Sequence, residues 1–326
     1  MLHENRGSVT DTDMRYKEKV LTKNPVVILL AFICSALWGS AFSGVKIGYE
    51  KFGIDSADWS SQMIFAGVRF AIAGIMALVF GSISARKLLL PTRKSVLKIM
   101  IISLFQTILQ YIFYYIGLAH TTGVKAAVIV AANVFMAILI SSLIYKIEKL
   151  TLHKIIGCIL GFSGIIIINF SGLKGGLSFS LFGDGFVLIS TVANGFSSVL
   201  IKRYSASENP VMLSGWQFFF GGLVMTLIGL ICGGNIGSVN AGSVMILLYL
   251  AFVSAAAYSL WSVLLKYNPV SKVAVFGFMN PVCGVIISDI VLKESSSFGV
   301  QVFVALLFVC GGIFAVNRKN IDKNIN

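Results

Sequence analysis

Ten apolar stretches, each about as long as a membrane crossing, occupy this chain from Pro25 almost to Asn317. A hydrocarbon core about 30 Å thick requires roughly 20 apolar residues per helix. We expect crossings at residues 25–49, 59–81, 96–119, 124–145, 152–170, 182–204, 210–232, 243–266, 270–292 and 297–317. The pattern therefore predicts an all-α membrane protein with ten transmembrane helices.

The composition excludes the soluble classes. Charged residues make up 12% of the chain, against about 25% in an ordinary soluble domain, and they concentrate between the apolar stretches. The net charge of +13 would suit a nucleic-acid-binding protein, but the positive residues are spread over many short connections and no basic helix is interleaved with aromatic residues. We expect the lipid bilayer as a partner and no nucleic acid.

The distribution of Lys and Arg predicts the orientation. If residues 1–24 form a cytoplasmic tail, 20 of the 26 Lys and Arg residues fall on the cytoplasmic side, five lie at or near the outer face and Arg69 lies within a helix. Cytoplasmic loops of membrane proteins carry such an excess. Residues 1–24 also lack a cleavable signal pattern. We therefore expect the cell (inner) membrane, with both termini, residues 1–24 and 318–326, in the cytoplasm.

The second half of the chain matches the first in collinear order. The matched pairs are Gly39 and Gly195, Lys46 and Lys202, Phe70 and Phe218, Gly74 and Gly222, Tyr111 and Tyr258, Lys125 and Lys272, and Asn133 and Asn280. We predict two repeats, at 25–170 and 181–317, joined by an outer linker at 171–180. Five crossings per repeat force the second copy to enter from the opposite face, and such inverted repeats are characteristic of secondary transporters.

Several short motifs add a family resemblance. They are Leu37-Trp38-Gly39-Ser40 followed by Lys46, then Arg69-Phe70, Lys146-Ile147-Glu148, Lys293-Glu294 and Asn280-Pro281-Val282. In order and spacing the chain resembles the drug/metabolite transporter (DMT) superfamily, EamA type, over nearly its whole length after residue 25. The resemblance implies a central cavity lined mainly by helices 1, 3, 4, 6, 8 and 9, and movement of small metabolites, often outward.

Polar side chains on the predicted helices mark the candidate cavity. Lipid offers no partner to a polar group, so a polar stripe should face another helix or a wet cavity. The expected cavity residues are Trp38, Ser43, Gln106, Gln110, Tyr111, Tyr114, Asn133, Asn194, Ser198, Tyr258, Trp261 and Asn280. For the small residues on the same stripes, close helix packing is the alternative interpretation.

Four further residues keep two interpretations each. Arg69, about ten residues into the second helix, is either structural or substrate-facing. Pro281 is either a simple bend or a hinge that frees a backbone carbonyl near Gly277. Lys46 and Lys202 either meet an anionic substrate or extend toward the membrane surface, as lysines at helix ends usually do.

The leading expectation is a secondary transporter that exports a small metabolite, with amino acids and related compounds first in line. The alternative is an importer of a vitamin or nucleoside-like aromatic metabolite; a membrane sensor and an intramembrane enzyme are distant alternatives. The sequence lacks the nucleophile elbow, zinc-protease and phosphate-loop motifs, and its five cysteines form no metal-binding pattern, so we expect no enzyme, metal or cofactor.

The sequence leaves the oligomeric state and the driving force open. Monomer and homodimer are both compatible with it. Helix 1 reads Ile33-Cys34-Ser35-Ala36 where small relatives carry a proton-exchanging carboxylate, while Asp184, Asp289 and His120 are expected near the outer surface. Proton coupling, exchange and facilitated passage therefore stay as alternatives.

Overall fold

The computed structural model describes residues 18–55, 57–121, 123–173, 179–237, 239–292 and 300–318, and these residues form helices and connections without strands. The first half contains α2 (Asn24–Phe52), α3 (Trp59–Ala85), α4 (Arg93–Ser103), η1 (Leu104–Leu109), α5 (Gln110–Ala119), α6 (Gly123–Ala131), α7 (Asn133–Leu139), η2 (Ile140–Ile144) and α8 (Leu152–Leu173). The second half contains η3 (Leu181–Gly185), α9 (Phe186–Tyr204), α10 (Pro210–Ile231), α11 (Ala241–Tyr267), α12 (Val270–Ala274), η4 (Val275–Phe278), α13 (Met279–Leu292) and α14 (Val300–Asn317).

Within the described residues, six helices are long and apolar enough to cross a membrane: Asn24–Phe52, Trp59–Ala85, Arg93–Ala119, Leu181–Tyr204, Pro210–Ile231 and Ala241–Tyr267. Four shorter apolar helices lie at Val128–Ile144, Leu152–Ile167, Val270–Gly284 and Phe303–Asn317. Large apolar side chains such as Phe80, Ile231 and Leu307 are more than half exposed. An apolar surface of this kind is suited to lipid rather than to water.

Helices α3 and α10 approach each other most closely through glycines. A Cβ atom added to Gly67 would lie 2.7 Å from the Gly222 oxygen, and one added to Gly74 would lie 2.5 Å from the Gly215 oxygen. The order of these contacts shows that the two helices run antiparallel. Small residues let membrane helices pack backbone to backbone, so these glycines set the separation of α3 and α10.

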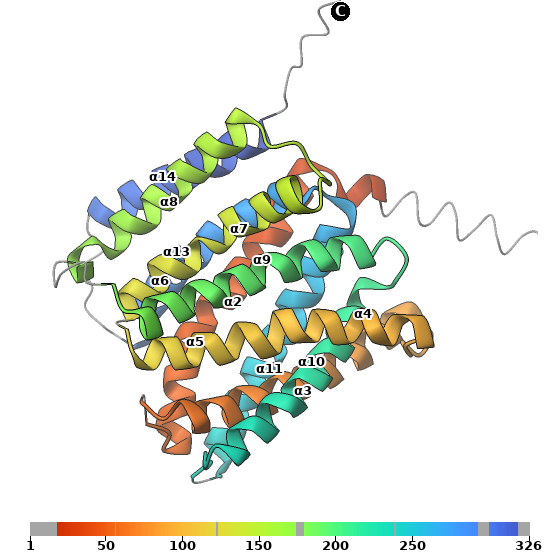
Figure 1. Ribbon diagram of the computed structural model, residues 1–326, viewed down its shortest axis with the longest axis vertical. Coiled ribbons are helices and arrows are strands. Elements are labelled where there is room, and N and C mark those ends of the chain that lie inside the picture. The colour runs from red at the N-terminus through yellow and green to blue at the C-terminus, as the bar shows by residue number, and fades with distance from the viewer. Residues whose placement is uncertain are drawn as a thin grey trace, which may run out of the picture.

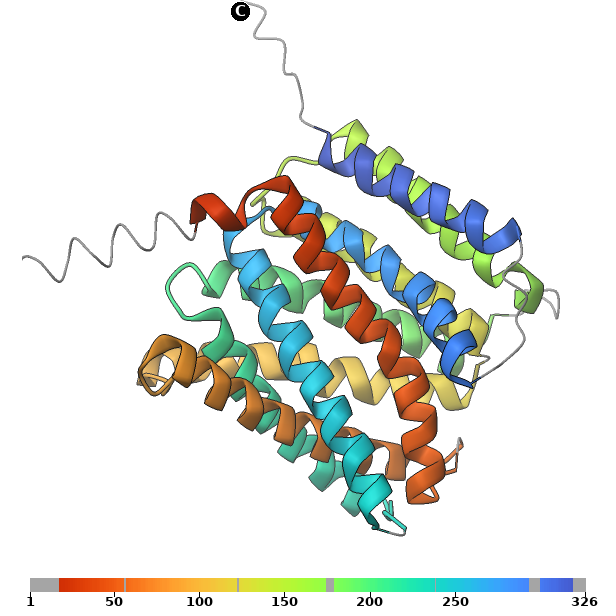
Figure 2. The same ribbon diagram turned by 180° about the vertical axis from the view of Figure 1, so that it is seen from behind.

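The same set of helix contacts occurs in both halves. Helix α2 packs on α11 and α13, and α9 correspondingly packs on α5 and α7. Helices α3 and α10 pack on each other, as do α8 and α14. The pair of α8 and α14 lies at one edge of the bundle, beyond α7 and α13, in both views (Figures 1 and 2). Helices from the two halves are thus interleaved in the centre.

In three of the apolar segments an irregular turn lies between two α-helices. The segment Arg93–Ala119 contains the π-helical stretch η1. The helix that follows is interrupted at Ala132, after which α7 begins with Asn133. In the second half, the 3₁₀ stretch η4 separates α12 from α13, and Asn280 and Pro281 lie in the first turn of α13. Hydropathy predicts the length of such segments but not these irregular turns.

Candidate functional site

The centre of the candidate site is a contact between two tyrosines from different halves. The hydroxyl oxygens of Tyr111 on α5 and Tyr258 on α11 lie 3.1 Å apart, within hydrogen-bonding distance. Tyr258 is 8% exposed and Tyr111 is half-buried. The sequence matched these two residues across the repeat, and the structure brings their side chains together.

A second polar pair extends this contact. The Asn194 amide nitrogen on α9 donates to the Gln110 side-chain oxygen on α5 at 3.0 Å, and Gln110 also interacts with the Tyr258 hydroxyl. Both amides therefore find partners inside the bundle, as buried amides must to avoid a large desolvation penalty. Four of the predicted cavity residues thus form one connected group.

Aromatic rings surround the polar group. Trp38 on α2 packs edge-on against Tyr258 and Trp261, with ring centroids 5.0 Å apart in each case. Phe70 on α3 and Phe218 on α10, another matched pair, stack at 5.1 Å and 7°. Phe70 also lies 4.6 Å from the Tyr111 ring, and Phe218 lies 4.7 Å from the Tyr258 ring. We call Trp38, Phe70, Tyr111, Phe218, Tyr258 and Trp261 the aromatic cluster.

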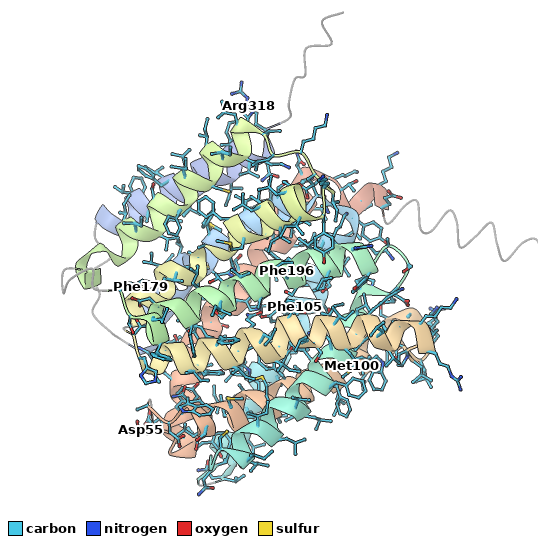
Figure 3. The ribbon with its side chains drawn as sticks, viewed as in Figure 1. Asp55, Met100, Phe105, Phe179, Phe196 and Arg318 are labelled. Carbon is cyan, nitrogen blue, oxygen red and sulfur yellow. The ribbon has the colours of Figure 1, made fainter. Side chains whose placement is uncertain are left out.

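The polar face of the third apolar segment continues toward the other end of the bundle. Gln106, in the π-helical turn, is 3% exposed and its side-chain oxygen has no hydrogen-bond partner. Thr107 beside it donates to the Gln217 side chain on α10 at 2.7 Å. Nearby, Phe105 packs on Phe196 of α9 at 5.3 Å (Figure 3). The π-turn therefore places Gln106 and Thr107 inside the bundle, and π-turns are frequent at functional sites.

Asn133 and Asn280 lie where their helices are interrupted. A Cβ atom added to Gly277, in η4, would lie 3.6 Å from the Asn133 side-chain oxygen, so the two interruptions face each other across the halves. The Asn280 side-chain oxygen has no hydrogen-bond partner. Pro281 follows it in the first turn of α13. This region contains an unpaired acceptor beside backbone that is not regular helix.

Arg69 on α3 is also buried, at 6% exposed. Its guanidinium carbon lies 4.4 Å from the centroid of the Phe70 ring. It is close enough to Tyr49, Tyr111 and Tyr258 to interact electrostatically with their hydroxyl groups. Its Nε atom has no hydrogen-bond partner. Arg69 thus borders the aromatic cluster.

Several predicted residues lie apart from this group. Ser43 is buried in α2, and the Ser198 hydroxyl donates to the Asn194 carbonyl on its own helix. Tyr114, in contrast, adjoins the aromatic cluster: it packs on Tyr115, with ring centroids 5.6 Å apart, and the Tyr115 ring lies 6.0 Å from the Tyr111 ring. Lys46 is exposed, and the Lys202 amine donates to the Lys266 carbonyl at 2.9 Å. Lys202 therefore binds a carbonyl in the last turn of α11, a structural contact.

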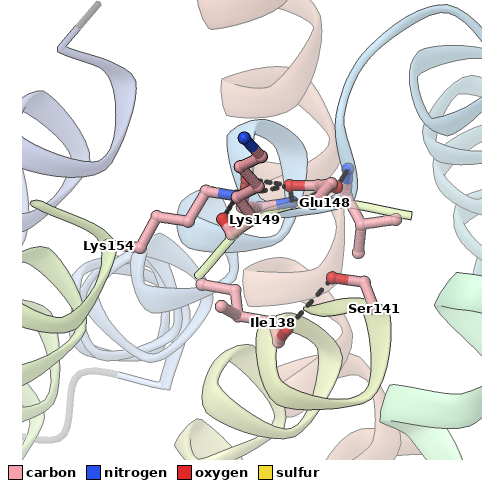
Figure 4. A network of polar contacts seen from close by, with 7 residues as sticks. Ile138, Ser141, Glu148, Lys149 and Lys154 are labelled. Carbon is pink, nitrogen blue, oxygen red and sulfur yellow. Dashed lines mark hydrogen bonds and ion pairs between the residues drawn. The ribbon is translucent and has the colours of Figure 1, made fainter. Parts of the chain in front are cut away.

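Glu148 joins the two halves at the end of the bundle near the start of α12. Its carboxylate accepts hydrogen bonds from the backbone nitrogens of Val270 and Ser271 and from the Ser271 hydroxyl. It also pairs with the Lys154 amine at 2.8 Å (Figure 4). A carboxylate at a helix N-terminus satisfies free N–H groups and meets the favourable end of the helix dipole. Glu148 therefore holds the loop after η2 against α12.

Asp184 has a comparable capping role at the other end of the bundle. The Thr121 hydroxyl donates to its carboxylate, and so does the Ser180 backbone nitrogen at 3.0 Å. The carboxylate thus holds the connection before α6 against the start of η3. Asp289 has no described side chain, so its expected place at the outer surface lies outside the described residues.

A groove of about 400 Å³ lies away from the aromatic cluster, between α2, α13 and α14. Its lining is apolar along Val27, Phe32 and Phe276, with Lys272 and Arg318 at its charged end. The central residues, in contrast, are packed on one another. In this structure the side chains at the centre therefore contact one another directly.

Sequence reasoning missed some members of the site. Phe70 and Phe218 were matched across the repeat but not assigned to the cavity, because apolar residues give no signal of facing a site. Glu148 was part of a family-like motif without a role. The matched spacing was the available signal for the two phenylalanines.

Comparison with known proteins agrees with this architecture. A solved protein structure superposes with a TM-score of 0.73 at 16% identity, covering 90% of this chain and 97% of the other. At that identity the likeness concerns the fold alone.

Curated relatives extend the comparison to sequence. The uncharacterized transporter YvbV of Bacillus subtilis is 26% identical over 93% of this chain and 94% of its own length. The uncharacterized transporter YetK of the same organism is 26% identical over 79% of each chain. The uncharacterized inner membrane transporter YedA of Escherichia coli is 26% identical over 86% of this chain and 89% of its own.

A family model accounts for both halves separately. The model of the EamA-like transporter family matches residues 25–170 and again residues 181–318. With the apolar helices described above, these matches identify an integral membrane protein of the transporter class. The chain belongs to the EamA-like transporter family.

Proposed function

We propose that this protein is a secondary transporter with ten membrane crossings in two inverted five-helix repeats. Movement of the repeats opens a central site first to one side of the membrane and then to the other. The site is the aromatic cluster together with Gln110 and Asn194. It sits in the cell (inner) membrane with both termini in the cytoplasm. The cargo is a small metabolite, with amino acids and related compounds first in line, and export is the proposed direction.

One observation carries this proposal: residues matched between the halves meet each other at the centre. Tyr111 contacts Tyr258 and Phe70 stacks on Phe218. Residues related by a twofold axis touch each other only if they lie close to that axis. A site on the axis between inverted repeats is where a rocking transporter binds its cargo.

The helix contacts support the same symmetry. The second-half counterparts of α2, α5 and α7 are α9, α11 and α13. Helix α2 contacts α11 and α13, and its counterpart α9 contacts α5 and α7. Gly39 faces Cys283 as Gly195 faces Met136, with an added Cβ atom 2.6 and 2.8 Å from the respective side chains. The antiparallel course of α3 and α10 suits a second copy inserted from the opposite face.

The chemistry of the site favours an amphipathic cargo. Indole and phenol rings offer flat apolar faces, while the amide pair offers directed hydrogen bonds. The Trp38 indole nitrogen is buried without a hydrogen-bond partner and so has a donor free for a ligand. An aromatic vitamin or a nucleoside would use the same groups, and import of such a compound is the alternative function.

A flux assay tests the proposal. Purified protein in liposomes is given a panel of labelled amino acids, nucleosides and vitamins, and we expect faster equilibration of at least one of them than in protein-free liposomes. Gln110→Ala and Asn194→Ala should each lower that flux, because each leaves the other amide unpaired at the site. Leu307→Ala, on the exposed face of α14, is the control that should transport normally.

Two results would count against it. If no solute in the panel moved faster than in protein-free liposomes, the transport function would be unsupported. If flux occurred and both amide variants matched the wild type, the assignment of the site to the Gln110 and Asn194 region would be wrong.

A further inference from the structure

The most unusual charge in the described part of the chain is the guanidinium of Arg69. It is buried at 6% exposed in a helix long and apolar enough to cross the membrane. The described residues place no carboxylate within 4 Å of it; their ion pairs are Lys98 with Glu208 and Lys154 with Glu148. A charge inside a membrane bundle without a counter-ion is costly, and such residues generally mark the path of a substrate or ion.

The neighbours of Arg69 do not compensate this charge. The Phe70 ring lies 4.4 Å from the guanidinium carbon, and the guanidinium interacts electrostatically with the hydroxyl groups of Tyr49, Tyr111 and Tyr258. These groups carry no charge at neutral pH. The ring face contributes a cation–π attraction, but it offers no acceptor to the guanidinium N–H groups.

The unpaired groups beside the aromatic cluster are donors. The Arg69 Nε atom and the Trp38 indole nitrogen are both buried without a hydrogen-bond partner. Trp38 packs on Tyr258, and Arg69 lies near the same hydroxyl. Two unpaired donors near one tyrosine call for an acceptor, and a carboxylate is the acceptor that a guanidinium fork fits best.

We propose that Arg69 is the anion-binding group of the central site, and that the cargo carries a carboxylate next to an aromatic or apolar body. The carboxylate pairs with the guanidinium, while the body of the cargo lies against the aromatic cluster. The identification of the bound anion as the cargo rests on the proposed function. The matched position on α10 is occupied by the neutral Gln217, whose side-chain oxygen accepts from Thr107, so the site has one charged pole and one neutral pole.

The test compares two probes of nearly the same shape, one an anionic carboxylate and the other a neutral amide. Full-length protein in detergent is titrated with phenylacetate and with phenylacetamide at pH 7, following thermal unfolding and the intrinsic tryptophan fluorescence, to which Trp38 and Trp261 contribute. We expect phenylacetate to bind about tenfold more tightly than the amide, as charge-assisted bidentate hydrogen bonds are the stronger kind. Equal effects of the two probes, nil included, would overturn the proposal.

Variants separate binding from a structural role. Arg69→Gln, which places the α10 residue type on α3, should abolish the preference for the acid, and Arg69→Lys should keep part of it. Without ligand, Arg69→Gln should melt no lower than the wild type, because it removes an uncompensated buried charge. Arg86→Gln, at an exposed arginine, is the matched control and should behave as the wild type.

Two results for Arg69→Gln would contradict the proposal. An acid preference that persists in Arg69→Gln, or a lower melting temperature of that variant without ligand, would make Arg69 a structural residue. Because these measurements need no transport, they are independent of the liposome assay. A protein that binds the acid through Arg69 and yet moves no solute would refute the proposed function and leave the anion site standing.

Discussion

The hydroxyl oxygens of Tyr111 and Tyr258 lie 3.1 Å apart, and the two residues are 147 positions apart in the chain, which is the offset between the repeats in this region. The contact joins α5 of the first half to α11 of the second. Any rocking of one half against the other must change it. The pair is therefore part of the proposed site and also a contact between the two halves.

Removing either hydroxyl should weaken the contact between α5 and α11. Tyr111→Phe and Tyr258→Phe keep the rings but lose the hydrogen bond, which contributes about 1 kcal/mol. We expect each variant to be destabilised by about that amount and the double variant by no more than either single one. Thermal unfolding in detergent measures this. Additive losses would mean that the two hydroxyls do not act as a pair.

A methyl group added to the glycines at the contacts between α2 and α13 and between α7 and α9 should destabilise the protein. In Gly39→Ala the new methyl group would lie 2.6 Å from the Cys283 Cβ, and in Gly195→Ala it would lie 2.8 Å from the Met136 Cβ. Overpacking of this kind costs about 1–3 kcal/mol. We expect both variants to melt at lower temperature than the wild type.

Gly311→Ala is the matched control for this pair, since a Cβ atom there meets nothing within 4 Å. Alanine favours a helix over glycine by about 1 kcal/mol, so this variant should be as stable as the wild type or more so. Wild-type stability in Gly39→Ala would contradict the described closeness of α2 and α13.

Replacing Glu148 should loosen the end of the bundle where it binds α12. Glu148→Gln keeps the size of the side chain but loses the charge that pairs with Lys154 and accepts from Val270 and Ser271. Hydrogen bonds to charged groups contribute about 1.5–3 kcal/mol, so we expect a clear fall in melting temperature. Glu50→Gln, at an exposed residue of α2, should change it little.

Acid should weaken the contact between Lys98 and Glu208. Burial raises the pKa of the Glu208 carboxyl, but hydrogen bonds from Lys98 and Ser95 outweigh it and hold that pKa below the ordinary value of 4.5. A lowered folded-state pKa means that the contact stabilises the protein above about pH 4.5 and that this stabilisation is lost as the pH falls through the lowered value. Melting temperature from pH 7 to pH 3 should fall less steeply in Glu208→Gln than in the wild type.

Reporter fusions test the topology. Fusions at residues 55, 90 and 235 should report the outside, the inside and the outside of the cell. They follow from the excess of Lys and Arg on one side of the membrane. A fusion at 90 that reported the outside would reverse the orientation.

The sequence predicted the apolar helices better than the irregular turns within them. Hydropathy indicates where a membrane helix can lie. The match between the two halves singled out Tyr111 and Tyr258, because both copies carry a tyrosine at the same position. Neither signal contains backbone geometry. The π-turn at Leu104–Leu109, the interruption at Ala132 and the 3₁₀ turn at Val275–Phe278 arise from tertiary packing.

The sequence also does not predict which side chains of one half contact residues of the other half. Lys202 was weighed as a contact for an anionic cargo, yet its amine binds the Lys266 carbonyl. Glu148 gave no sign that it would meet Val270, because the two are 122 residues apart. Such contacts depend on how the helices are placed, which composition and periodicity do not specify. The burial of Arg69 was foreseeable from its position, but its lack of a counter-ion was not.

The central claim, that one site is reached from either side in turn, can be tested without knowing the cargo. In a variant with its five cysteines replaced by alanine, Tyr258→Cys is exposed to a membrane-impermeant thiol reagent in right-side-out and in inside-out vesicles, with Leu264→Cys as a buried control on the same helix. The account predicts labelling of residue 258 from both sides and none of residue 264. Labelling of residue 258 from one side only, or from neither, would contradict it.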